Sequence, residues 1–455
     1  METRTQTDAL GAMELPADAP WGIHAARAVR NFPLPGNRVN PRLLRALLTT
    51  KKACALTNGE LGFLAREKAE AIAEACDALA EEETGFDLLP ALQGGAGTST
   101  NLLVDELIAR RTGLRAIEDV NLHQSTNDVY PTALRIAAVL AFRELAEATA
   151  QLQGIFQRLE KRFASVPIVG RTEWVEAVPL TLGAQFSVFS EAFARDRWRT
   201  FKCEERLRVV NLGGTAVGTG LTAPRDYVFL AVETLRELTG LGLARAENLV
   251  EATANADAFV EVSGMLKALA CNLRKCGNDL RILQLQGLIR LPAVQAGSSI
   301  MPGKINPVIL ESVVQTAIKI CANDGIVAEC AGTGTLQINE YLPLLADALL
   351  ESLDLSIASV GMLARHAEGI EADEIECRRR FDASTEIVTA FLPLIGYDRA
   401  GKLVETFRQT GGSDFRRFLE ERLGRETVAR VLAPENLMAL GHRRTDLEPE
   451  GGPES

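Results

Sequence analysis

The chain has 455 residues and a formal net charge of -11. An acidic balance of this size argues against a nucleic-acid binder, which would need a clustered basic surface. The length is enough for about three domains and a large hydrophobic core. The sequence shows neither a cationic start followed by an apolar run nor an uncharged apolar span of membrane length, so we expect a cytoplasmic protein.

The cysteines and histidines do not form metal-binding patterns. There are eight cysteines and four histidines, and no two cysteines have the C-x-x-C spacing of zinc or iron–sulfur sites. In a long chain of this kind we expect buried thiols rather than disulfides. The sequence therefore predicts a metal-free mechanism.

Three long runs of apolar residues have helical spacing. The first follows Pro131 and continues to Phe163, the second begins at Phe259 with alternating spacings of three and four, and the third follows Pro307, a residue suited to a helix start. The positions of the second run are Val262, Leu266, Leu269, Leu273, Cys276, Leu280 and Leu283.

These runs predict an all-α protein. We expect an N-terminal helical domain over residues 1–121, a central bundle of long helices over 122–375, and a small C-terminal helical domain over 376–455 that ends in a disordered polar tail. Long apolar seams also favour self-association, although each seam could instead pack inside its own chain.

Four stretches are rich in glycine, hydroxyl and amide side chains where a helical bundle would be expected to carry leucine. Several hydroxyls and amides with one lysine are suited to binding carboxylates. A fifth stretch, GGTAVGTGL at 213–221, has no strand-to-helix context for a dinucleotide, and we expect close backbone packing there. The four are GGAGTSTN (94–101), HQSTNDVYPT (123–132), GRTEWVEAVPLTLG (170–183) and GSSIMPGKINP (297–307).

The last stretch is not a nucleotide-binding loop. A P-loop has four residues between its glycines and then Gly-Lys followed by Ser or Thr. Here five residues separate Gly297 from Gly303, and Ile305 follows Lys304, so no hydroxyl is available for magnesium.

Together these stretches resemble the conserved blocks of the aspartase/fumarase superfamily. GSSIMPGKINP is similar to its signature loop, and the segments MELPADAPWGIHAARAVRNFPL, KCGNDLRIL and LIGYDRA extend the resemblance over nearly the whole chain. Within the superfamily the motifs are most similar to those of the branch that removes ammonia from aspartate. The resemblance implies a three-domain all-α homotetramer with a 20-helix core and active sites assembled from three subunits.

The resemblance also implies the chemistry, a cofactor-free β-elimination of ammonia from L-aspartate to give fumarate. It assigns Ser298 as the base that removes the proton, through an aci-carboxylate that hydrogen-bond donors stabilise. His123 is expected to be structural. The residues that match substrate-binding positions are Thr98, Ser125, Thr126 and Ser299 for the carboxylate next to the reacting carbon, Thr172, Lys304, Asn306 and the Met301 backbone for the other carboxylate, Asn127 for the leaving group, and Glu173.

Glu173 and Trp174 depart from the family pattern, which commonly has histidine or glutamine after Gly-Arg-Thr. An ionised glutamate favours a cation, and Trp174 offers a cation–π face, so a bulkier ammonium or betaine substrate that releases trimethylamine is a second hypothesis. Glu173 could instead pair with Arg171 and never contact substrate. The sequence also leaves open fumarate hydration and a non-enzymatic role as a helical scaffold.

Overall fold

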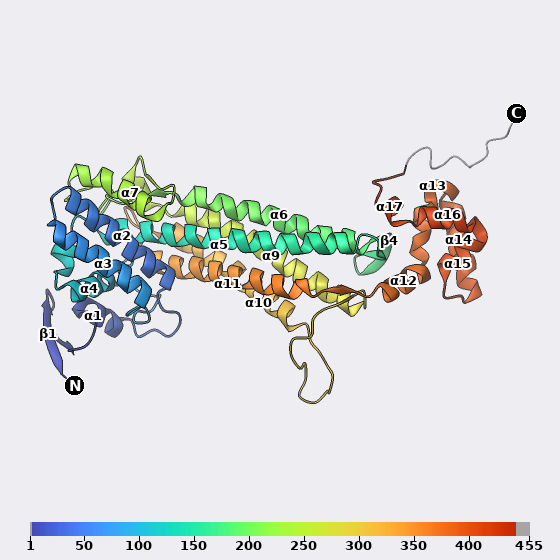
Figure 1. Ribbon diagram of the computed structural model, residues 1–455, viewed down its shortest axis with the longest axis horizontal. Helices are drawn as coiled ribbons and strands as arrows, with labels where there is room; N and C mark the ends of the chain where they lie inside the picture. Colours follow the sequence, from blue (N-terminus) through green and yellow to red (C-terminus); the bar gives the residue numbers. More distant parts are fainter. Residues whose placement is uncertain (1, 443–455) are drawn as a thin grey trace. The chain divides into compact units, whose positions relative to one another are not determined.

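The computed structural model describes residues 2–442 and is built mainly from helices (Figure 1). No helix in that range is long and apolar enough to cross a membrane. The predicted all-α class is confirmed. Five of the helices have 26 or more residues: α5 (Thr126–Arg162), α6 (Leu182–Leu207), α9 (Asp257–Leu285), α10 (Val308–Thr333) and α11 (Leu342–Glu368).

The three predicted runs correspond to α5, α9 and α10. All seven apolar positions of the second run are buried in α9. Helix α10 begins directly after Pro307. Proline suits this position because it has no N–H, and the first N–H groups of a helix have no partner inside the helix. Helix α5 starts five residues before Pro131 and therefore includes this proline near its first turn.

The chain forms two compact units, and each contains a part of every one of the five long helices. Unit 1 comprises residues up to 147, 196–271 and 316–358. Unit 2 comprises 148–195, 272–315 and the described residues from 359 onward. The three-domain division stays a prediction, and the predicted disordered tail lies almost entirely outside the described residues.

Unit 1 begins with an antiparallel hairpin of β1 (Thr3–Asp8) and β2 (Gly11–Pro16), which the sequence analysis did not identify. Helix α2 packs against α3 and α7. The other elements of this unit are α1 (Ile23–Asn31), α2 (Pro41–Glu60), α3 (Arg66–Glu82), α4 (Thr98–Thr112), the π-helix η1 (Ala116–Val120), α7 (Arg225–Thr239), α8 (Leu249–Ala254), and the paired strands β5 (Val209–Val210) and β6 (Ala244–Arg245).

Polar contacts join neighbouring long helices inside unit 1, in addition to their buried apolar seams. Because these contacts connect α5, α6, α9, α10 and α11 in succession, the helix segments form one bundle. The contacts are Arg143–Glu204, Arg206–Glu261, Ser263–Asp324 and Asn323–Ser352.

In unit 2, Phe156 of α5 lies among the aromatic rings of Phe186, Phe189 and Phe193 of α6. The C-terminal helices enclose an apolar cluster that includes Val169 of the β3–β4 hairpin. The elements are β3 (Pro167–Thr172), β4 (Val175–Thr181), β7 (Ile289–Arg290) paired with β8 (Glu371–Ala372), α12 (Glu374–Ala383), the 3-10 helix η2 (Thr385–Phe391), α13 (Leu392–Ile395), α14 (Tyr397–Thr410), α15 (Phe415–Leu423), α16 (Arg425–Val431) and α17 (Pro434–Leu437).

Candidate functional site

The predicted site residues fall into two groups, one in each unit. Unit 1 carries four of them, at the starts of α4 and α5, and unit 2 carries the other seven, on the β3–β4 hairpin and the loop that precedes α10. The unit 1 group is Thr98, Ser125, Thr126 and Asn127, and the unit 2 group is Thr172, Glu173, Ser298, Ser299, Met301, Lys304 and Asn306.

The start of α5 is fixed by reciprocal capping between Ser125 and Asp128. The Ser125 Oγ accepts a hydrogen bond from the Asn127 N–H at 3.3 Å, and the Asp128 Oδ1 accepts one from the Ser125 N–H at 2.9 Å. The first N–H groups of a helix have no partner inside the helix, so a cap of this kind determines where α5 begins. Thr126 occupies the first helical position.

Asn127 is held by its backbone and its side chain. Pro131 has no N–H to donate to the carbonyl four residues earlier, which leaves the Asn127 carbonyl without its helical partner. The Asn211 side chain supplies the missing donor at 2.9 Å. The Asn127 amide nitrogen donates to the Ala216 carbonyl at 2.7 Å, which leaves the amide oxygen for another ligand.

The glycine-rich segment 213–221 packs closely against α5 and α8, as the sequence predicts. The buried Asp128 carboxylate accepts hydrogen bonds from the N–H groups of Gly213 and Thr215, at 3.1 and 3.0 Å. Burial raises the pKa of Asp128 to about 6, although its backbone donors act in the opposite direction. At Gly218, where φ is +83°, an added Cβ would lie 2.4 Å from the carbonyl oxygen of Leu249.

Thr98 is the first residue of α4, beside the first turn of α5. Gly97, with φ of +94°, precedes it, and a Cβ at Gly97 would lie 2.4 Å from the Tyr130 ring, so only glycine permits this approach. The Thr98 hydroxyl donates to the Gly95 carbonyl at 2.7 Å. Unit 1 therefore brings Thr98 and the 125–127 segment together at two helix N-termini, which favour anions.

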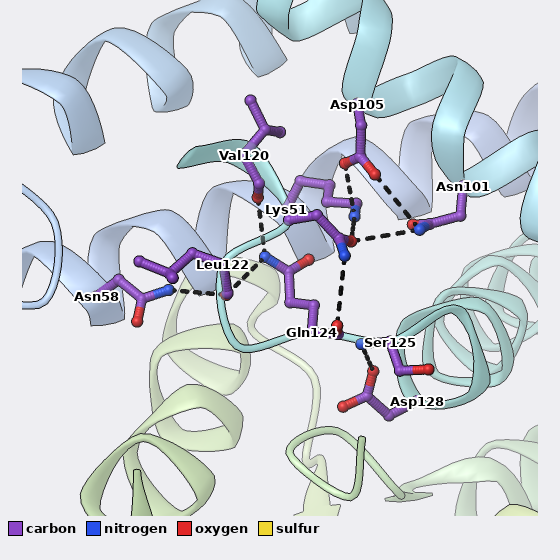
Figure 2. Close-up of polar contacts among 10 residues, drawn as sticks. Lys51, Asn58, Asn101, Asp105, Val120, Leu122, Gln124, Ser125 and Asp128 are labelled. Carbon is purple, nitrogen blue, oxygen red and sulfur yellow. Dashed lines mark hydrogen bonds and ion pairs between the residues drawn. The ribbon is translucent and has the colours of Figure 1, made fainter. Parts of the chain in front are cut away.

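Behind these residues lies a polar network that the sequence analysis did not identify (Figure 2). Lys51 of α2 forms an ion pair with Asp105 of α4, with 2.7 Å between Nζ and Oδ1, and both side chains are fully buried. The Lys51 Nζ also donates to the Asn121 Oδ1 at 2.7 Å. The only signal of this network in the sequence is the pair of adjacent lysines, Lys51 and Lys52, among the mainly apolar residues of α2. That signal does not show which residues Lys51 contacts.

His123 has a structural role in the described chain. Its Nδ1 lies 2.7 Å from the Asn58 Oδ1, and its ring packs edge-on against Phe63 and Tyr227. Burial lowers the pKa of this imidazole. These contacts agree with its omission from the predicted site.

In unit 2, the loop from Gly297 to Asn306 presents Ser298 with two donors. The N–H groups of Ile300 and Met301 donate to the Ser298 Oγ, at 3.2 and 3.0 Å. Because both donors point at this oxygen, a negative charge on it would be stabilised. Ser298 is half-buried.

The same loop is closed by bonds between its two ends. The Gly297 N–H donates to the Lys304 carbonyl at 2.7 Å, and the Asn306 side chain donates to the Gly297 carbonyl at 2.8 Å. A Cβ on Gly297 would lie 2.5 Å from the Lys304 oxygen, which explains the glycine. Ser299 and Lys304 are exposed, and within residues 2–442 the Lys304 ammonium forms no ion pair.

The β3–β4 hairpin places Thr172 and Glu173 at its tip. Glu173 and Trp174 form the two-residue turn, with φ of 50° and 71°, a left-handed conformation that costs non-glycine residues about 1 kcal/mol or more each. Arg171 pairs with Glu176 at 2.8 Å, so the arginine named as a partner for Glu173 is engaged elsewhere. Glu176, next to the turn, also accepts from Ser384 at 2.7 Å, which ties this end of the hairpin to the residue after α12.

A cavity of about 390 Å³ lies beside this hairpin within unit 2. Glu173 and Trp174 line it together with Lys275 and Asp279 of α9. The last two side chains form an ion pair, so the cavity wall contains both charge signs next to an indole. Such a wall can bind a cation at Glu173 and Trp174.

Comparisons with known proteins identify relatives of this chain in sequence and in fold. A family model described as Lyase matches residues 11–322. The aspartate ammonia-lyase of Pseudomonas aeruginosa is 40% identical over 464 residues, which cover 96% of this chain and 97% of that protein. Among solved structures, the fumarate lyase:delta crystallin of Brucella melitensis has a TM-score of 0.90 at 38% identity, covering 95% of this chain and 99% of that one. The class II fumarase of Schistosoma mansoni has a TM-score of 0.89 at 26% identity, covering 97% and 100%.

Replacing Gly218 by alanine is expected to destabilise the protein by on the order of 3 kcal/mol, because the Cβ meets the Leu249 backbone at a left-handed φ. Gly264→Ala is the matched control. Gly264 lies in α9, and a Cβ added there meets nothing within 4 Å. Urea denaturation measures both variants. Equal midpoints for the two would contradict the close packing of the 213–221 segment.

Proposed function

Because the chain belongs to the aspartase/fumarase superfamily and is a carbon–nitrogen lyase of that group, we propose that it converts L-aspartate to fumarate and ammonia. The observation that carries this proposal is the pair of backbone N–H groups at the Ser298 oxygen, in a loop that also bears Lys304, whose ammonium forms no ion pair among the described residues 2–442. The named activity of the Pseudomonas aeruginosa relative supports the choice of substrate.

Ser298 acts as the base in the proposed reaction. A serine hydroxyl is a poor base unless its alkoxide is stabilised, and the donors at Ile300 and Met301 are placed to stabilise it. The alkoxide takes the proton from C3 of aspartate. The electron pair then forms the carbon–carbon double bond as the C–N bond breaks, and the ammonium group leaves as neutral ammonia.

The carboxylate next to C3 gains a second negative charge while the proton is removed. Thr98, Ser125 and Thr126 carry hydroxyls at the N-termini of α4 and α5, where the helix dipoles favour negative charge. Ser299 adds a hydroxyl from the signature loop. Donors that bind the dianion better than the substrate lower the barrier rather than only the KM.

The other carboxylate and the amine are assigned to the remaining residues. Lys304 supplies the full positive charge for this carboxylate, and Thr172, Asn306 and the Met301 backbone add hydrogen bonds. The Asn127 amide oxygen, left open by the bond of its nitrogen to Ala216, accepts from the leaving ammonium.

The site residues lie in two units, and we propose that different subunits of a homotetramer bring them together. The active sites would then combine residues of three subunits around a 20-helix core, in the three-domain arrangement predicted from the sequence. Most soluble oligomers are homo-oligomers with closed symmetry. The absence of a metal or organic cofactor, and a cytoplasmic location in which the eight free cysteines stay reduced, complete the proposal.

A second candidate is a lyase for a larger ammonium or betaine amino acid that releases trimethylamine. The cavity lined by Glu173 and Trp174 favours it, because a carboxylate and an indole face recognise a quaternary ammonium. Fumarate hydration is disfavoured by the same glutamate, and the intact Ser298, Lys304 and Asn306 argue against a non-enzymatic scaffold.

Ser298→Ala is expected to reduce kcat for L-aspartate roughly a thousandfold, because the proton acceptor is lost. The measurement is the ultraviolet absorbance of fumarate formed by purified protein at saturating substrate. Ser413→Ala, in an exposed loop of unit 2, is the matched control and should keep full activity. A Ser298→Ala variant as active as the parent would overturn the assignment of the base.

Glu173→Gln is expected to raise kcat/KM for L-aspartate about fivefold. The substitution removes a negative charge whose repulsion of a substrate carboxylate is worth about 1 kcal/mol. Glu173→Asp keeps the charge and should not give this gain. The assay compares aspartate with a betaine amino acid. If Glu173→Gln instead abolishes trimethylamine release and leaves aspartate unaffected, the second candidate replaces the first.

Mixing two inactive variants tests the shared site. Ser298→Ala and Asn127→Ala chains, unfolded together and reassembled, should recover about a quarter of the parental activity if the two residues of one site come from different subunits. Each variant reassembled alone is the control. No recovery from a mixture shown to contain hybrid tetramers would place both residues in the same subunit.

A further inference from the structure

The ion pair of Lys51 and Asp105 is an energetically unfavourable feature of unit 1. Both side chains have no exposed surface, and Nζ and Oδ1 lie 2.7 Å apart. Transfer of two charges from water to the interior costs several kcal/mol per ion, and apolar residues of similar volume often give equal or greater stability. The fold alone therefore does not account for this pair.

The pair fixes the orientation of one amide. The Asn121 Oδ1 accepts from the Lys51 Nζ at 2.7 Å and from the Asn101 Nδ2 at 3.3 Å. The Asn101 amide also lies 3.4 Å from the Asp105 carboxylate, so all four side chains belong to one network (Figure 2). With its oxygen held by two donors, the Asn121 amide must direct its nitrogen the other way.

That nitrogen donates to the Gln124 carbonyl at 3.3 Å. Gln124 directly precedes Ser125, so this carbonyl belongs to the peptide group that leads into the cap of α5. The Gln124 side chain donates to the Val120 carbonyl at 2.9 Å, which closes the turn from the other end. The network thus reaches the backbone of the proposed substrate donors without occupying their position.

The same ion pair also reaches α4, the helix that carries Thr98. Asn101 and Asp105 lie one and two turns after Thr98 on α4. Lys51, anchored on α2, therefore connects the helix that presents Thr98 with the turn that presents Ser125 and Thr126. A shift of either segment by about 1 Å would be enough to lower catalysis on the order of a hundredfold.

We propose that Lys51, Asp105 and Asn121 are positioning residues that hold Thr98 and the 125–127 segment in register for the carboxylate next to the reacting carbon. This inference rests on the proposed function for the identity of that carboxylate. None of the three residues touches the substrate. They act through the Gln124 peptide and through α4.

The test replaces the pair by apolar residues. Lys51→Met alone leaves Asp105 buried without its partner and is expected to fold poorly. The double variant Lys51→Met/Asp105→Leu removes both charges and is expected to keep the parental thermal midpoint within a few degrees. Its kcat for L-aspartate should fall about a hundredfold with a smaller change in KM, because the lost alignment matters most in the transition state.

Asn121→Ala is the second variant, since it keeps the Lys51–Asp105 ion pair and removes the amide that links Lys51 and Asn101 to the Gln124 carbonyl. It should show the same loss of kcat. Lys52→Met is the matched control: this neighbouring lysine pairs with Asp77 at the surface and does not reach the network. It should retain parental kcat. A stable double variant with parental kcat would show that the pair is only structural and would overturn the proposal.

Hydrogen–deuterium exchange separates failure of this inference from failure of the proposed function. The N–H groups of Ser125 and Asn127 are hydrogen-bonded in the cap. Exchange in the 121–128 peptide should become at least tenfold faster in the double variant and in Asn121→Ala, and not in Lys52→Met. This readout needs no substrate, so it holds even if the parent does not act on aspartate. Unchanged exchange in both variants would overturn the positioning role.

Discussion

The unit 1 half of the candidate site depends on how the free N–H groups at the start of α5 are satisfied. A helix that begins in the interior must find partners for these groups, or it incurs the full cost of their desolvation. The Ser125 Oγ accepts from the Asn127 N–H, and the Asp128 carboxylate accepts from the Ser125 N–H and also from Gly213 and Thr215 of the glycine-rich segment. The cap of a 37-residue helix and a glycine-rich loop are thereby fixed to one another. The position of Asn127, and the availability of its amide oxygen, follow from this arrangement.

Two of the fully buried carboxylates of this unit, Asp105 and Asp128, lie next to the candidate site. Desolvation raises the pKa of both Asp105 and Asp128 to about 6, which means that each carboxylate is less stable in its ionised form than it would be in water. Structural ion pairs also perturb pKa values, so the shift alone does not define function. What distinguishes these two residues is where their contacts lead. Asp128 accepts directly from the Ser125 N–H, and Asp105 pairs with Lys51, which is linked through Asn121 to the Gln124 carbonyl. Burying these charges costs stability, but it holds the turn before α5 in one defined geometry.

Local patterns in the sequence predicted three of the five long helices, α5, α9 and α10, because each seam is visible within a single segment: the α9 positions are all buried, and Pro307 precedes α10 as expected. The same holds for the signature loop, whose internal bonds join residues less than ten apart. The β1–β2 hairpin was missed, since its alternation is polar and covers only six residues per strand. Lys51 and Asp105 were missed for a different reason. Their contact joins residues 54 positions apart, and a single sequence gives no indication of which buried carboxylate a lysine will meet.

The hairpin tip carries the strongest constraint on the choice of substrate. A two-residue turn of this type is most easily made by Asn-Gly, yet here both positions are occupied by larger residues at positive φ. Such strain persists only where the surroundings compensate for it, and the hydrogen bond from Ser384 to Glu176 holds the hairpin next to the turn. The turn therefore presents an unshielded carboxylate and an exposed indole at a fixed place beside a cavity. A carboxylate there repels a second carboxylate and attracts an amine, so elimination of an ammonium group fits this site better than addition of water to fumarate.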